Sequence, residues 1–127
     1  MFSTSPAFSG YSVNDLDAAL VFYRDTLGLS VTKTKEGLDL ALLGCSVFLY
    51  PKPNHTPATF TVLNFVVEDI NKAVDMLKEK GITLQNYDSD MMKADEKGIY
   101  RGKAAGHGPD IAWFKDPAGN ILSILEK

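Results

Sequence analysis

The chain has 127 residues, of which 45% are hydrophobic and 23% are charged, a composition that suits one globular domain and excludes a disordered chain. Sixteen acidic residues against thirteen Lys and Arg give a net charge of −3, which argues against a nucleic-acid-binding protein. No apolar run approaches the roughly 18 residues of a membrane span, and residues 1–6 lack the basic start of a signal peptide. We therefore expect a cytoplasmic protein without membrane or nucleic-acid partners.

The first half of the chain predicts a strand, a helix and three further strands. A strand-like run at residues 8–13 comes first. Residues 16–27 carry hydrophobic side chains at helical spacing, with Asn14 or Asp15 placed to cap the helix and Gly28 placed to end it. Three β-type runs follow, at residues 29–34, 38–43 and 45–50. The single cysteine, Cys45, lies in an apolar stretch, and we expect a buried thiol there rather than a catalytic one.

The second half repeats this order. Its capping position, Asp69, lies 54 residues after Asp15, whereas its terminating glycine, Gly81, lies 53 residues after Gly28. The run at residues 60–67 precedes this helix, and β-type runs follow it at residues 82–87, 110–114 and 121–125. Because cap, hydrophobic stripe and terminator agree in register, the sequence predicts an α+β fold built from two βαβββ modules.

We expect a single domain over residues 1–127, with module 1 at about 7–50, a proline-rich connector at 51–58 and module 2 at about 59–127. Module 2 contains a loop at residues 88–109, with one short strand expected near Ile99 and Tyr100. Loops of this length often cover a binding site, and the alternative is a surface excursion. Each helix covers one face of a four-stranded sheet, and the two remaining faces are expected to enclose a cleft.

Two motifs resemble those of a known superfamily. The run at residues 13–19, with Phe22-Tyr23 and Leu27-Gly28-Leu29, resembles the opening of vicinal oxygen chelate proteins, which include glyoxalases, bleomycin-resistance proteins and extradiol dioxygenases. The run FKDPAGN at residues 114–120 resembles their closing hairpin. A tight turn at Pro117 and Gly119 would set Trp113 opposite Ser123.

The resemblance implies where a metal would bind in this chain. Metal-dependent members hold a divalent cation with side chains from the first and last strands of each half. The matching positions here are Phe8, Phe48, Val62 and Ser123, and only Ser123 offers even a weak ligand. We therefore expect no metal and no cofactor. His55 and His107 fall in loop segments and are expected to be exposed polar residues.

Strand alternation predicts a mostly apolar and aromatic cleft with a few polar points. The resemblance places Trp113 where extradiol dioxygenases carry a catalytic tyrosine, and an indole has no titratable proton for that role. The expected ligand-binding residues are Phe8, Ser12, Phe48, Tyr50, Val62, Asn64, His107, Trp113 and Ser123.

Three functions fit this sequence. The first is metal-free binding of a small aromatic or amphipathic molecule, and the second is a glyoxalase-type lyase or isomerase with a displaced or weak metal site. The third is a protein-association domain with a closed cleft. A general base would have to come from Tyr50, Lys115, His107 or Asp110, so no catalytic residue is assigned. The resemblance also implies a homodimer.

Overall fold

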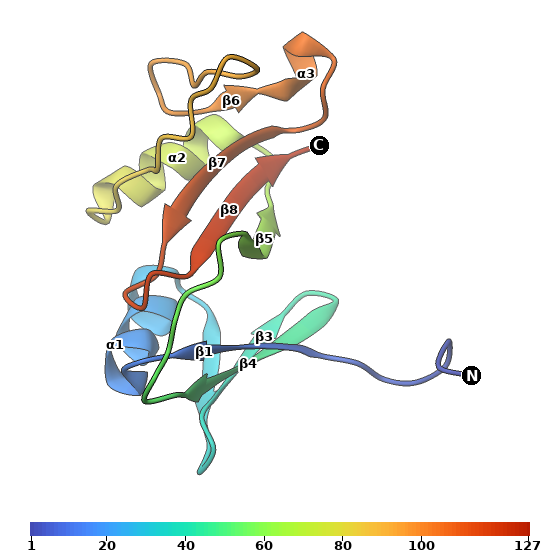
Figure 1. The fold of residues 1–127 in the computed structure, drawn as a ribbon, viewed down its shortest axis with the longest axis vertical. Coiled ribbons are helices and arrows are strands. Elements are labelled where there is room, and N and C mark those ends of the chain that lie inside the picture. The colour runs from blue at the N-terminus through green and yellow to red at the C-terminus, as the bar shows by residue number, and fades with distance from the viewer. The chain divides into compact units, whose positions relative to one another are not determined.

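A computed structural model describes residues 1–127 and divides them into two compact units, Met1–Pro57 and Ala58–Lys127 (Figure 1). Each unit contains one four-stranded sheet and a principal helix between its first and second strands. The predicted α+β fold of two βαβββ modules is therefore confirmed. The extent of the domain as a whole stays a prediction. None of the helices has the length and apolar character needed to cross a membrane.

Unit 1 contains a mixed sheet in which the first strand pairs in parallel with the last. The strand order is β1-β4-β3-β2, so the strand that precedes the helix lies at one edge. Its elements are β1 (Ser9–Val13), α1 (Leu16–Leu20), η1 (Val21–Thr26), β2 (Ser30–Lys33), β3 (Leu38–Leu42) and β4 (Cys45–Pro51).

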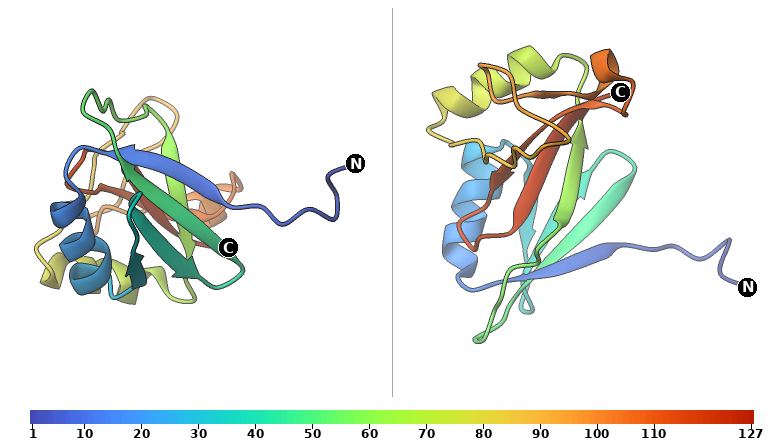
Figure 2. Two further views of the ribbon diagram at one scale, coloured as in Figure 1. Left: turned by 90° about the horizontal axis from the view of Figure 1, so that it is seen from below. Right: turned by 45° about the horizontal axis from the view of Figure 1, so that its top comes forward.

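The helix of unit 1 changes type along its length. Asp15 caps its start, with Oδ1 accepting a hydrogen bond from the Ala18 amide at 3.1 Å, and Gly28 follows its end at a φ of 73°. Between them, α1 gives way to the π-helical segment η1, in blue in Figure 2. A π-turn holds one residue more than an α-turn. It therefore accommodates the additional residue that the offset change from 54 to 53 reveals in this helix.

The face of the unit 1 sheet that packs on this helix is buried, and the opposite face is not. Tyr11 of β1 and Tyr23 of η1 meet across the core with their hydroxyl oxygens 2.9 Å apart. The buried strand residues on this face are Tyr11, Val13, Leu38, Leu40, Val47 and Leu49. The prediction of a buried Cys45 is wrong: it opens β4 beside the Gly44 turn and is exposed, because the helix does not cover that end of the sheet.

Unit 2 repeats the arrangement, with the strand order β5-β8-β7-β6 and α2 across one face of β7 and β8. Asp69 caps α2 through the Lys72 amide at 3.1 Å, as the repeat predicted. Its elements are β5 (Thr61–Val66), α2 (Ile70–Glu79), β6 (Tyr100–Arg101), α3 (Gly102–Ala105), β7 (Asp110–Lys115) and β8 (Ile121–Glu126). The buried residues at the helix–sheet contact are Ile70, Val74, Leu77, Ala112, Phe114, Leu122 and Ile124.

The predicted strand at residues 82–87 does not form. Two short segments instead share the outer edge of β7. The Gln85 amide donates to the Trp113 carbonyl at 2.8 Å, whereas β6 pairs with Asp110 and Ile111 further along the same edge. The short strand expected near Tyr100 is thus confirmed as the fourth strand of this sheet, and residues 82–87 are held by isolated hydrogen bonds.

The closing hairpin has the predicted register. Trp113 of β7 lies opposite Ser123 of β8, and Gly119 has a φ of 84° in the turn. Buried Asp116 fixes this turn by accepting hydrogen bonds from the Ala118 amide at 2.9 Å, the Asn120 amide at 2.8 Å and the Asn120 side chain at 3.0 Å. The hairpin therefore positions Trp113 on the face of the sheet away from α2.

Candidate functional site

Trp113 lies at the centre of an aromatic group on the face of the unit 2 sheet that points away from α2. Its indole nitrogen donates to Thr61 Oγ1 at 2.9 Å, across the β5 register shift between Thr61 and Leu63. The rings of Tyr87 and Tyr100 meet the indole edge-on, with centroids 5.5 Å and 5.3 Å away. The only polar atom of the indole is thus satisfied, and the ring is held in place for contact with other apolar groups.

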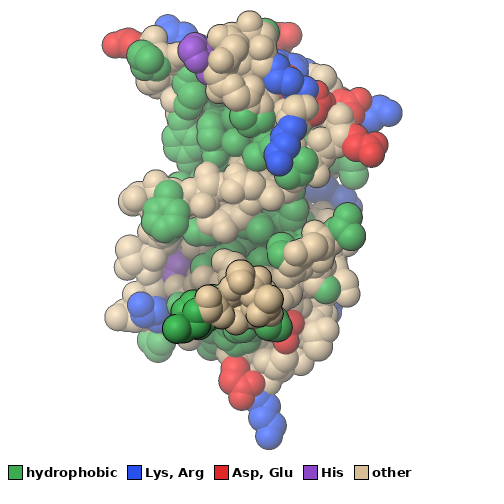
Figure 3. Space-filling view, turned by 90° about the vertical axis from the view of Figure 1, so that its right-hand side faces the viewer, with side chains coloured by type: hydrophobic (Ala, Val, Ile, Leu, Met, Phe, Trp, Pro, Cys, Tyr) green, Lys and Arg blue, Asp and Glu red, His purple; other side chains and the backbone are tan.

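Two cavities adjoin Trp113. The larger has a volume of about 580 Å³ and lies between the loop at residues 91–93 and the β6–α3–β7 segment, with Ile111 and Pro109 in its wall. The smaller has a volume of about 210 Å³ and contains Phe60 and Tyr87. Both cavities share Trp113 and Met92. Hydrophobic side chains gather on the surface of unit 2, in the upper part of Figure 3, and this mixture of rings, aliphatic groups and few polar atoms is typical of small-molecule sites.

An ion-pair network fixes the wall of the larger cavity. Arg101 Nε pairs with Asp95 at 2.8 Å, and Nη1 pairs with Asp110 at 3.4 Å. Its third nitrogen donates to Asn71 Oδ1 of α2 at 2.8 Å. Partial burial alone would raise the pKa of Asp95, but hydrogen bonds from the Ile99 amide and from Arg101 outweigh it and hold that pKa below its usual range. Arg101 of β6 is therefore tied to the loop and to β7 by ion pairs, and to α2 by a hydrogen bond.

Replacing Asp95 by asparagine tests this network by its pH dependence. Because the folded-state pKa of Asp95 is depressed, its contribution to stability is present above the usual value of about 4 and is lost as the pH falls through the folded pKa. We expect D95N to lower the free energy of unfolding by about 1–2 kcal/mol at neutral pH, with the difference from wild type narrowing below about pH 4. Urea unfolding at both pH values measures this. A difference that does not change with pH, or one matched by the exposed control D90N, would contradict the assignment.

The hydroxyl groups of Tyr100 and Tyr87, two residues that contact Trp113, differ in their hydrogen bonding. The Tyr100 hydroxyl donates to Asp88 Oδ1 at 2.9 Å and accepts from the Tyr87 amide at 2.6 Å. The hydroxyl oxygen of Tyr87 is buried and has no hydrogen-bond partner, and burial raises the pKa of this phenol. A buried hydroxyl without a partner carries a desolvation cost that a phenyl ring avoids.

We therefore expect Y87F to raise the free energy of unfolding by about 1 kcal/mol. Thermal and urea unfolding would show it as a higher midpoint with an unchanged urea dependence. The matched change Y100F removes a hydroxyl with two partners and should destabilise. Equal changes in the free energy of unfolding of Y87F and Y100F would contradict the assignment of hydrogen-bond partners to the Tyr100 hydroxyl alone.

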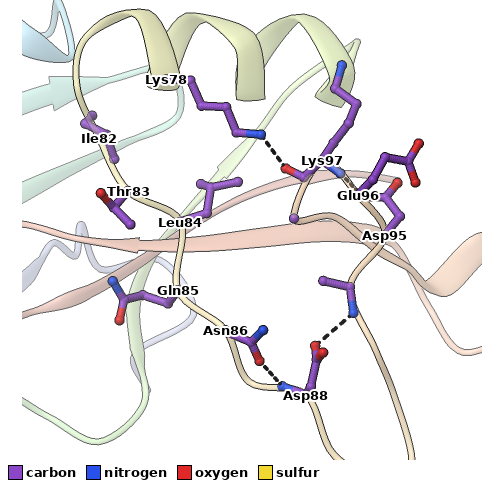
Figure 4. A pocket seen from close by; sticks show the side chains of 12 residues that line it. Lys78, Ile82, Thr83, Leu84, Gln85, Asn86, Asp88, Asp95, Glu96 and Lys97 are labelled. Carbon is purple, nitrogen blue, oxygen red and sulfur yellow. Dashed lines mark hydrogen bonds between the residues drawn. The ribbon is translucent and has the colours of Figure 1, made fainter.

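A third cavity, of about 560 Å³, lies between the end of α2 and the loop and is lined mainly by polar groups (Figure 4). These groups bond to one another. Lys78 Nζ donates to the Lys97 carbonyl at 2.9 Å, and Asp88 Oδ1 accepts from the Ala94 amide at 2.9 Å. Its side chains thus anchor the loop, and we assign no ligand to it.

The comparisons with known proteins agree with this architecture. The family model described as the Glyoxalase/Bleomycin resistance protein/Dioxygenase superfamily matches residues 7–124. The chain belongs to this superfamily. The uncharacterized protein YraH of Bacillus subtilis is 25% identical to it, over 90% of this chain and 91% of YraH.

Solved structures of the superfamily share the fold at low identity. A glyoxalase family protein from Enterococcus faecalis has a TM-score of 0.70 at 21% identity, covering 99% of this chain and 100% of that one. The fosfomycin resistance protein FosX from Listeria monocytogenes has a TM-score of 0.69 at 9% identity, covering 98% and 93%.

The superfamily's divalent metal does not fit the residues of this chain. Phe8, Phe48 and Val62 bring only carbon to three of the four matching positions, and the hydroxyl of Ser123 lies 2.5 Å from Asn64 Oδ1. No group of three or more His, Cys, Asp or Glu side chains is placed to hold a metal ion. The donor chemistry of these positions therefore departs from that of the metal-dependent superfamily members.

The predicted site residues of unit 2 lie at different places. Trp113 and His107 both line the larger cavity, and the His107 side chain is exposed, as its loop position predicted. Asn64 and Ser123 bond to each other on neighbouring strands. Val62 lies at the β5 register shift, where it opposes no residue of β8.

The predicted site residues of unit 1 lie on or beside its uncovered sheet face. The rings of Phe48 and Tyr50 stack with centroids 6.1 Å apart. Phe8 precedes β1 and is 70% exposed. His55 is not the exposed loop residue we expected: it is half-buried, with Nδ1 2.6 Å from Ser12 Oγ. A contact between residues 43 positions apart leaves no local signal in the sequence.

Sequence reasoning missed several side chains around Trp113. Tyr87 comes from a predicted strand that does not form, and Met92 comes from a loop, so strand alternation gave the position of neither side chain. Tyr100 carried a usable signal, because the short strand expected near it had to pair with a neighbour, and β7 offered a free edge.

Proposed function

We propose that this protein binds a small aromatic or amphipathic molecule at Trp113, without a divalent metal. The observation that carries the proposal is the fixed indole bordering two adjoining cavities, in a superfamily fold where three of the four usual metal-ligand positions hold carbon side chains. A planar ring stacking on Trp113 gains both apolar burial and aromatic contact. Asn64, a sequence-predicted residue of the same unit, is proposed as a further contact. A homodimer stays a prediction that native mass spectrometry tests.

Calorimetric titration with 2-naphthamide, a neutral two-ring probe, tests the site. We expect saturable binding by the wild type and at least a 10-fold loss of affinity in W113L, because the aliphatic side chain loses the ring contact, worth about 1.4 kcal/mol or more. The control F2L changes an exposed aromatic residue that lines neither cavity. Its affinity should equal that of the wild type. Unchanged binding by W113L would overturn the proposed function, as would a wild type that binds neither this probe nor its charged analogues.

A further inference from the structure

The ionisable side chains around the larger cavity carry charge of one sign. Lys93, Arg101 and His107 line it, together with the phenol of Tyr100, and no carboxylate side chain does. Burial raises the pKa of Tyr100, so this phenol stays neutral at physiological pH. Charge in the cavity wall is therefore zero or positive at every ionisable position, although the chain as a whole is acidic.

The three basic side chains differ in how far their charge is balanced. Asp95 and Asp110 both pair with Arg101, so its charge mainly holds the wall in place. Lys93 and His107 are exposed and form no salt bridge. Asp88 of the same loop feels the Lys93 charge, but its carboxylate is engaged mainly by the Ala94 amide and the Tyr100 hydroxyl, which together hold its pKa below the usual range.

An apolar aromatic wall and basic side chains outside any salt bridge favour a particular class of ligand. The Trp113 face attracts planar rings and, taken alone, would also attract cations. Lys93 opposes a cation and favours an anion, since this positively charged residue lines the same cavity. We propose that the preferred ligand of the Trp113 site is an aromatic anion, a planar ring that carries a carboxylate or a similar acidic group. This inference rests on the proposed function and specifies its ligand class.

Three probes with one ring system test the charge preference. We expect 2-naphthoate to bind about 3- to 5-fold more tightly than neutral 2-naphthamide, the range for a solvent-exposed charge pair. The cation 2-naphthylmethylammonium should bind most weakly. Raising the salt concentration from about 50 mM to about 500 mM should reduce the preference for the anion, because salt screens an exposed ammonium group.

Substitutions test whether Lys93 and His107 cause the preference for the anion. K93Q, and the double variant K93Q/H107Q, should bring the ratio of anion to neutral affinity close to one. The matched control K72Q removes an exposed charge of α2 that lines none of the three cavities and should keep the wild-type ratio. Equal affinities of the three probes, a preference for the cation, or a ratio unchanged in the double variant would overturn the inference while leaving the proposed function intact. Absence of binding by all three probes would instead overturn the proposed function.

Discussion

Replacing Phe114 by alanine should lower the free energy of unfolding by about 3–5 kcal/mol, the range for truncation of a large buried ring. Phe114 is fully buried on the α2 face of β7, among the residues that form the helix–sheet contact of unit 2. Its removal costs the transfer free energy of the ring and leaves a cavity that the surrounding strands fill only in part. Urea unfolding followed by circular dichroism measures the loss.

Phe60 offers the matched control for this prediction. It is 68% exposed, so F60A should change the free energy of unfolding by less than about 0.5 kcal/mol. A similar loss in both variants would mean that the α2 face of β7 is not the core of this unit. Substitution of Phe114 should mainly change stability, whereas substitution of Trp113 should mainly change binding, because neighbouring residues of a strand point to opposite faces of the sheet.

The second large effect is expected at the closing hairpin. D116A should lower the free energy of unfolding by about 3 kcal/mol, because it leaves buried hydrogen-bond donors without an acceptor. The donors are the Ala118 amide and the amide and side chain of Asn120. D116N, which keeps one carbonyl oxygen, should lose less.

Asp90 provides the control for the hairpin. It is an exposed acidic residue of the same unit, and D90A should leave stability within about 0.5 kcal/mol of the wild type. If D116A were as stable as D90A, the hydrogen bonds around Asp116 would not hold the turn, and the position of Trp113 would need another explanation.

Local patterns in the sequence correctly predicted the features that depend on neighbouring residues, namely the helix caps and the closing turn. Asp15 and Asp69 each cap a helix by accepting a hydrogen bond from the backbone amide three residues later. The turn before Asn120 sets the register of β7 and β8. Gly28 lies one residue further from its capping Asp15 than Gly81 lies from Asp69, and the π-helical segment Val21–Thr26 accommodates that residue. No π-helical segment was predicted from the sequence offsets.

The remaining features depend on contacts between distant segments. Residues 82–87 have strand-like composition, yet β6 takes part of the β7 edge that they would need. The bond between Ser12 and His55 and the ring contacts of Trp113 with Tyr87 likewise join segments that no periodicity connects. The sequence therefore pointed to Trp113 but not to most of its neighbours.

We propose that Trp113 binds an aromatic molecule without a divalent metal, and its own fluorescence can test this. Because Trp113 is the only tryptophan, quenching of protein fluorescence reports directly on this site. The direct measurement is a 2-naphthoate titration of protein dialysed against EDTA, repeated after addition of Mn²⁺, Ni²⁺ or Zn²⁺. We predict saturable quenching with the same dissociation constant in every case. Quenching that appears only after a metal is added, or that never saturates, would contradict the account.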